Sequence, residues 1–171
     1  GFGGDTPTVT GATELYNGTG WGELNDLNTA RSQLGGDGTA TSALAVGGDQ
    51  PPPAAAVTES WDGTSWTEVS DLNTTRKYLA GVGASSTSAI AFAGCNPGPT
   101  AYDLTETWNG SSWTEVNDLN TARSTLAGTG IQTAALAFGG PSSSDLTETW
   151  NGTSWTEVND LNTARAQFDG I

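Results

Sequence analysis

Glutamate and arginine recur together four times along the chain. In every copy the arginine follows the glutamate by 17 residues, as in Glu14 and Arg31, Glu59 and Arg76, Glu106 and Arg123, and Glu148 and Arg165. These groups could bind an anion and supply a nucleophile if they converged on one centre from non-equivalent positions. Because each copy carries both groups in the same register, we interpret them instead as repeated Glu–Arg pairs that tie strands together. The chain has no histidine, which removes the commonest general base and metal ligand, so we expect no catalytic residues.

A tryptophan stands seven residues after each glutamate, and its ring could stack on a sugar. The four are Trp21, Trp66, Trp113 and Trp155. Tryptophan at a fixed place in a repeat is typical of packing between repeated units, so we interpret these residues as structural. Turns rich in Asp and Asn follow, at 25–26, 71, 117–118 and 159–160. Calcium needs several oxygen ligands from one loop, so we expect side chains that cap these turns, and no metal or cofactor.

The elements that position these residues are repeated in tandem. The stretch 104–123 recurs almost letter for letter at 146–165, with degenerate copies at 12–31 and 57–76, and successive arginines are 45, 47 and 42 residues apart. A period in this range is typical of propellers and solenoids. In each period we predict four short strands and no helix. The arginine opens the first strand, and the second strand alternates large residues with alanine and ends in glycine. An Asn-Gly or Asp-Gly turn joins the third strand to the fourth, which begins with tryptophan.

This order of strands resembles the kelch repeat over essentially the whole chain. The kelch glycine pair falls on Gly47–Gly48 and Gly139–Gly140, the Glu-x-aromatic element on Glu106 and Trp108, and the late tryptophan on Trp113. Tryptophan replaces the usual tyrosine three times, Ala93 replaces one glycine, and the hairpin between the aromatic residues is shorter than in kelch. The segment 107–113 also resembles the Asp-box hairpin of sialidase-like propellers. Both resemblances imply an all-β fold, a β-propeller of four-stranded blades.

The repeat frames, approximately 1–31, 32–76, 77–123 and 124–171, form one domain of about four blades. In this frame the strands 165–171 and 1–4 belong to the same blade, so both chain ends would complete it. The same two strands could instead pair between chains, which would give a larger ring or an open fibre. We therefore predict self-association or ring closure through the terminal strands.

Segments that follow the glycine residues vary, whereas the rest of the period repeats. Variable loops on a rigid scaffold commonly carry binding specificity. Our candidate binding residues come from three such loops and are Asp49, Gln50, Pro51, Pro52, Pro53, Asn96, Pro97, Tyr102, Pro141, Ser142 and Asp145. Four Asn-x-Ser/Thr sequons could carry glycans, although Asn-Gly-Thr is also a plain turn sequence. They lie at Asn17, Asn73, Asn109 and Asn151.

Composition narrows the function. Five basic and 19 acidic residues give a net charge of −14, which opposes binding to nucleic acid and to anionic lipid. No apolar run approaches the ~20 residues of a membrane span. Kelch-like arrays of this Trp-Asn-Gly type are similar to those of phage and environmental surface proteins. The resemblance implies a non-catalytic structural, adhesive or binding module of a virion, tail fibre or filament, with glycans or another surface protein as partners. The alternatives are an intracellular kelch-type adaptor that docks a partner protein and, less favoured, a sialidase-like glycosidase.

Overall fold

The computed structural model describes residues 1–5, 7–50, 54–96, 98, 100–141 and 144–166. These residues form fourteen β-strands and no helix, which confirms the predicted all-β class. Twelve strands form three antiparallel sheets of four strands each, and the other two form a two-stranded sheet. The repeated four-stranded unit is therefore confirmed for three periods. No helix in the described part of the chain is long and apolar enough to span a membrane.

Each sheet is built from strands that are consecutive in the sequence. The N-terminal sheet contains β1 (Glu14–Tyr16) and β2 (Trp21–Glu23). The second sheet contains β3 (Gly35–Thr39), β4 (Ser42–Val46), β5 (Thr58–Trp61) and β6 (Trp66–Val69). The third contains β7 (Ala80–Ser85), β8 (Ser88–Phe92), β9 (Thr105–Trp108) and β10 (Trp113–Glu115). The fourth contains β11 (Ala127–Ile131), β12 (Ala134–Phe138), β13 (Thr147–Trp150) and β14 (Trp155–Glu157).

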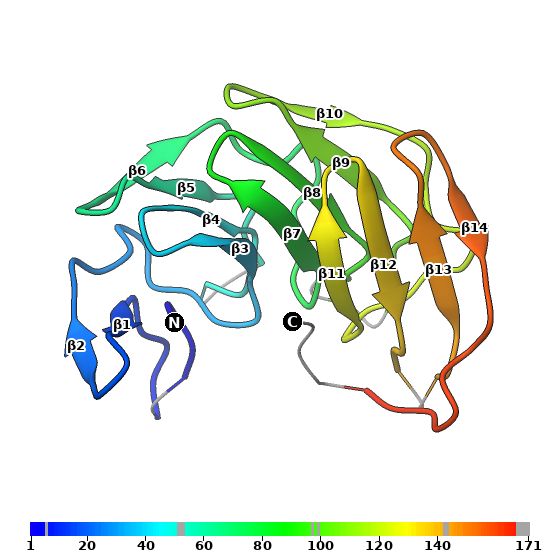
Figure 1. Cartoon of the computed structure of the whole chain (residues 1–171), viewed down its shortest axis with the longest axis horizontal. Coiled ribbons are helices and arrows are strands. Elements are labelled where there is room, and N and C mark those ends of the chain that lie inside the picture. The colour runs from blue at the N-terminus through cyan, green and yellow to red at the C-terminus, as the bar shows by residue number, and fades with distance from the viewer. Residues whose placement is uncertain (6, 51–53, 97, 99, 142–143, 167–171) are drawn as a thin grey trace.

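The four sheets lie side by side in an arc (Figure 1). The first strands of the complete sheets, β3, β7 and β11, lie towards the middle of the arc, and β2, β6, β10 and β14 lie on its outer rim. The N-terminal sheet and the fourth sheet are at opposite ends. Each connection between sheets therefore runs from the outer strand of one sheet to the inner strand of the next. We call these connections, at 24–34, 70–79 and 116–126, the crossing segments.

The Asn-Gly turns form four-residue hairpin loops between the paired tryptophans. Trp108 lies directly opposite Trp113 in the register of β9 and β10. The Asn109 side-chain oxygen accepts hydrogen bonds from the backbone N–H groups of Ser111 (2.9 Å) and Ser112 (3.0 Å). The next residue, Gly110, has φ 93°, a left-handed conformation that favours glycine. The sequence Asn-Gly thus supplies both requirements of this loop, a side-chain acceptor and a residue with positive φ.

The prediction that arginine opens the first strand of each sheet was wrong. The strands β3, β7 and β11 begin four residues after Arg31, Arg76 and Arg123. Between arginine and strand lies a non-glycine residue with positive φ, namely Gln33 (55°), Tyr78 (56°) or Thr125 (51°). The Tyr78 N–H donates to the Gln33 carbonyl (2.9 Å) and the Thr125 N–H donates to the Tyr78 carbonyl (3.0 Å). At this residue the backbone therefore bonds to its equivalent in a neighbouring period, although the residue before it still pairs within its own period, as Lys77 does with Cys95.

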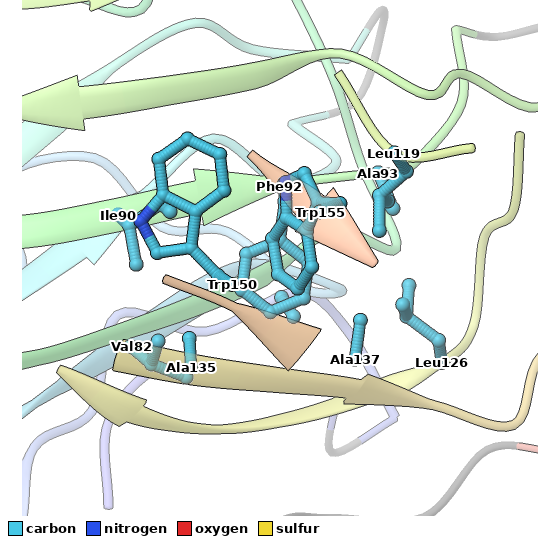
Figure 2. Packing of buried hydrophobic residues seen from close by; sticks show 11 residues of the cluster. Val82, Ile90, Phe92, Ala93, Leu119, Leu126, Ala135, Ala137, Trp150 and Trp155 are labelled. Atoms are coloured by element: carbon cyan, nitrogen blue, oxygen red, sulfur yellow. The ribbon is translucent and has the colours of Figure 1, made fainter. Parts of the chain in front are cut away.

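Alternation of large and small residues on the second strand explains how the sheets stack. Leu44 and Val46 on β4 pack with Ala89 and Ala91 of the third sheet. The large residues of β8, Ile90 and Phe92, pack in turn with Ala135 and Ala137 of the fourth sheet. Figure 2 shows this last cluster, in which Phe92 meets Trp155 with ring centroids 4.9 Å apart. In both interfaces the face with large residues meets a face with alanine, which allows close packing of the two sheets.

The inner strands approach each other most closely where both carry glycine. Gly81→Ala is expected to lower the free energy of unfolding by about 1–3 kcal/mol, the usual cost of overpacking. A methyl carbon at Gly81 would lie 3.0 Å from the Gly36 nitrogen and 3.2 Å from the Gly35 carbonyl carbon, and both neighbours are backbone. Urea denaturation would measure the loss. Gly22→Ala is the control, because a methyl group there has no neighbour within 4 Å. Equal effects of the two substitutions would contradict close packing of β3 against β7.

The N-terminal residues lie beside β1, as the repeat frame predicts. Phe2 forms an antiparallel bridge with Thr13, and the backbone N–H of Glu14 donates to the Gly1 carbonyl (2.9 Å). Of the strand predicted at 165–171, residues 167–171 lie outside the described part of the chain. Completion of one blade by both ends stays a prediction.

Candidate functional site

Three arginines and three glutamates form buried ion pairs. Arg31 Nη1 lies 2.6 Å from Glu59 Oε1, Arg76 Nη2 lies 2.8 Å from Glu106 Oε1, and Arg123 Nη2 lies 2.7 Å from Glu148 Oε1. The exposed fraction of every one of these side chains is 2% or less. Each arginine binds the glutamate of the following period, not the one 17 residues before it. The pair therefore joins the crossing segment to the third strand of the sheet that the segment enters.

The centre around Glu106 illustrates the arrangement. Its second carboxylate oxygen accepts hydrogen bonds from the backbone N–H and the side-chain amide of Asn73, both at 2.8 Å. Arg76 Nη1 donates to the backbone carbonyls of Ala93 (3.0 Å) and Leu104 (2.9 Å). Glu106 thus fixes the turn before the arginine as well as the arginine itself. Asn28 and Asn120 make the same contacts with Glu59 and Glu148.

Electrostatics support a structural role for these centres. Burial lowers the pKa of Arg76 below its ordinary value, and the charge of Glu106 opposes that shift. The same cause and the same opposition act on Arg31 and Arg123. A charged pair that is removed from water in this way depends on its partner to stay ionised. The buried guanidinium groups are out of reach of a substrate in solvent.

The fourth copy of the pair has different surroundings. Glu14 lies exposed on β1. Arg165 is also exposed, its Nε donates to the Thr163 carbonyl at 3.4 Å, and its own carbonyl accepts from the Gly140 N–H at 3.1 Å. Three buried Glu–Arg pairs therefore form, and each joins two successive periods rather than the glutamate and arginine of one copy.

The tryptophans seven residues after glutamate connect neighbouring sheets. Trp113 Nε1 donates to Thr58 Oγ1 of the second sheet at 3.0 Å. The bonds from Trp66 to Thr13 and from Trp155 to Thr105 are equivalent and also measure 3.0 Å. Trp66, Trp113 and Trp155 are 5%, 6% and 5% exposed, so they cannot stack on a sugar, whereas Trp21 is 63% exposed.

Contrary to the expectation from the sequence, the carboxylates of the Asp-rich turns do not cap the turns but accept from a threonine N–H 13 residues earlier in the same period. Asp118 Oδ1 accepts from the Thr105 N–H at 3.0 Å, and Asp71 Oδ1 accepts from the Thr58 N–H at 3.3 Å. Asp26 and Asp160 bond Thr13 and Thr147 in the same way. Within the described residues no three His, Cys, Asp or Glu side chains group as metal ligands would.

A surface ion pair lies beside two of the three candidate binding loops. Lys77 Nζ lies 2.9 Å from Asp49 Oδ2, and this hydrogen bond raises the pKa of Lys77. Cys95 forms bridges with Lys77 and Ala101, and burial raises the pKa of its thiol, which makes it a poor nucleophile. Of the remaining candidates, Tyr102 forms a backbone bridge with Arg123. Four others are exposed, namely Gln50, Asn96, Pro141 and Asp145. The rest lie outside the described residues, namely Pro51, Pro52, Pro53, Pro97 and Ser142.

The four sequons divide into two kinds. Asn17, Asn109 and Asn151 are exposed, and their side-chain oxygens accept the hydrogen bonds of the hairpin loops. The amide nitrogen of Asn73 donates to Glu106 Oε2 and to the Trp113 carbonyl. A glycan on Asn73 would break this contact, so the Asn-Thr-Thr sequence there is explained by the ion-pair centre.

Asparagine is the member of the centre that the sequence reasoning missed. Asn28, Asn73 and Asn120 are the residues concerned. The triplet Leu-Asn-Thr occurs at the same place in all four periods. That constancy was the available signal, because a turn that needed only capping would tolerate Asp or Ser at this position.

Comparisons with known proteins add no family to these structural observations. No protein-family model matches the chain, and no relative is found among curated proteins.

Proposed function

We propose that this chain is a non-catalytic adhesive or binding module of an extracellular assembly, such as a virion, a tail fibre or a filament. We further propose that its sheets are kelch-like blades of a β-propeller. One observation carries the proposal. The groups best suited to chemistry, arginine and glutamate, are buried in the same structural contact in three successive sheets. A catalytic centre would need such groups to converge from non-equivalent positions and to reach a substrate.

Binding is assigned to the loops that vary between periods. The exposed residues Asn96 and Gln50 belong to two of these loops, near the Asp49–Lys77 ion pair. Polar side chains on a rigid frame suit recognition of a neutral glycan, and the net charge of −14 disfavours anionic ligands. Glycans are therefore the proposed ligands and another surface protein is the second candidate. The chain would meet copies of itself through its terminal strands.

The two alternative functions have less support. A sialidase-like glycosidase needs accessible arginines, but Arg31, Arg76 and Arg123 are at most 2% exposed. An intracellular adaptor that docks an acidic peptide would need a basic pocket, and the chain carries only five basic residues, three of which are buried in ion pairs.

Glycan-array binding would test the proposal. Replacing residues 96–102 with residues 142–144, the part of the shorter loop that precedes the equivalent aspartate, is expected to abolish or change glycan binding without changing the melting temperature. The matched control is Gly110→Asn in a hairpin loop that does not vary, which should leave the glycan profile unchanged. Hydrolysis of a fluorogenic sialoside by the intact chain would overturn the non-catalytic assignment, and absence of any bound glycan would overturn the ligand class.

A further inference from the structure

We propose that the exposed face of the N-terminal sheet docks onto the fourth sheet of a second copy of this chain. In this contact Trp21 Nε1 would donate a hydrogen bond to Thr147 Oγ1 of the other copy. The proposal rests on the assembly role proposed above. It places the contact between copies on the faces of two sheets, and not only on the terminal strands.

The contact is already present three times inside the chain. A tryptophan of one sheet donates to a threonine of the sheet before it at 3.0 Å in the pairs Trp66–Thr13, Trp113–Thr58 and Trp155–Thr105. A leucine of the crossing segment packs against the same tryptophan and is buried, as for Leu27, Leu72 and Leu119. Each interface thus has a donor face with the tryptophan and an acceptor face with the threonine and leucine.

An additional bond closes two of these interfaces at the rim. Asn25 Nδ2 donates to the Thr64 carbonyl and Asn117 Nδ2 donates to the Thr153 carbonyl, both at 2.8 Å. The asparagine belongs to the acceptor side and the threonine to the hairpin loop of the donor side. The two sides of the interface therefore differ, so all sheets stack in the same direction. An array of this kind can be extended by further sheets at either end.

A donor face without an acceptor stands at the N-terminal end. Trp21 is 63% exposed and Tyr16 is 53% exposed, although the tryptophans equivalent to Trp21 are at most 6% exposed. Tyr16 lies directly opposite Trp21 in the register of β1 and β2, and the two ring centroids are 5.4 Å apart, so both rings belong to one face. Large apolar residues that cluster on the surface of a soluble domain commonly mark an interaction site.

The matching acceptor face stands at the other end. Thr147 Oγ1 donates to the Asp145 carbonyl at 3.4 Å, as Thr13 Oγ1 donates to the Gly11 carbonyl at 3.5 Å. Thr13 accepts an indole N–H in that same arrangement, so Thr147 is oriented to accept one. Leu161 is only half-buried, and Asn159, which is equivalent to Asn25 and Asn117, is exposed.

A second copy fits these faces better than ring closure within one chain. The two faces lie at opposite ends of the arc (Figure 1), and the arc is held by three packed interfaces. The contact is heterologous, because it joins different faces, so it can build a ring of copies or a fibre. Each copy carries a charge of −14, so association should strengthen as salt screens the repulsion.

Light scattering after size exclusion, across the micromolar range and at two salt concentrations, would test the inference. The intact chain is expected to have at least twice the mass of one copy, more so at the higher salt concentration. Trp21→Ala should weaken association by at least about tenfold, as expected for a central tryptophan anchor. Thr147→Val should weaken it less. Thr156→Val on exposed β14 is the control and should leave the mass unchanged.

A mass of one copy at every concentration would overturn the proposal. This holds both if Trp21 is accessible to the quencher acrylamide and if ring closure within one chain shields it. Unchanged association of Trp21→Ala would also overturn it. The glycan array separates this failure from that of the proposed function. A monomeric Trp21→Ala variant that still binds glycan would leave the loop assignment intact, and an assembling chain that binds no glycan would leave the interface intact.

Discussion

Trp113→Ala is expected to lower the free energy of unfolding by about 3–5 kcal/mol, the usual cost of removing a buried aromatic side chain. The ring is 6% exposed, packs against Trp108 with centroids 5.4 Å apart, and donates to Thr58 Oγ1 at 3.0 Å. The substitution would leave a cavity between the second and third sheets and would remove the partner of a buried hydroxyl group. Guanidinium denaturation followed by circular dichroism would measure the loss.

Trp21→Ala is the matched control, because Trp21 occupies the same place in its period and is 63% exposed. At concentrations where the chain is monomeric, this control should change the free energy of unfolding by less than about 1 kcal/mol. A change that small in Trp113→Ala would show that the sheets do not depend on this contact. It would also return the tryptophans to consideration as sugar-stacking residues.

Features that repeat within one period could be predicted from the sequence. Alternation of Ile90 and Phe92 with alanine indicates a strand with one large and one small face, because side chains on a strand alternate. Asn109 followed by glycine indicates the hairpin. These signals are local, so the number, type and order of strands in the three four-stranded sheets follow from them.

Features that depend on a neighbouring period could not be predicted. The constant separation of Glu106 and Arg123 suggested a pair within one copy, but Arg123 binds Glu148 and Glu106 binds Arg76. The pairs that form are 28, 30 and 25 residues apart, because each spans a loop of variable length, so the constant separation of 17 within one copy did not reveal them. The positive φ at Tyr78, which delays the start of β7, arises likewise from a hydrogen bond to another period.

The environment of a repeated residue is therefore set by the sheet beside it. Trp21 and Trp113 share their place in the period, yet only Trp113 has an acceptor sheet against it in the described structure. This is the behaviour of a linear array, in which stability comes from interfaces between neighbours. The exposed face that carries Trp21 is accordingly the surface on which we base the proposed assembly.

Arg76→Ala and Glu106→Gln are each expected to lower the free energy of unfolding by about 3–5 kcal/mol, because either change leaves a buried charge without its partner. The two side chains are at most 1% exposed and 2.8 Å apart. Glutamine has one acceptor oxygen, so it cannot serve both Arg76 and Asn73, which Glu106 serves with its two oxygens. Urea denaturation of both variants would measure the losses, and glycan binding should be unaffected while the variants stay folded.

The double substitution Arg76→Met with Glu106→Leu refines this prediction. Replacing a buried ion pair with apolar residues of similar volume is often neutral. Here we expect the double variant to stay destabilised, because the N–H of Asn73 loses its acceptor inside the turn that leads to β7. Glu115→Gln, on exposed β10 opposite Glu106, is the control and should be close to neutral. Full recovery of stability in the double variant would show that Glu106 serves only the arginine, and that the turn before Arg76 is held by other contacts.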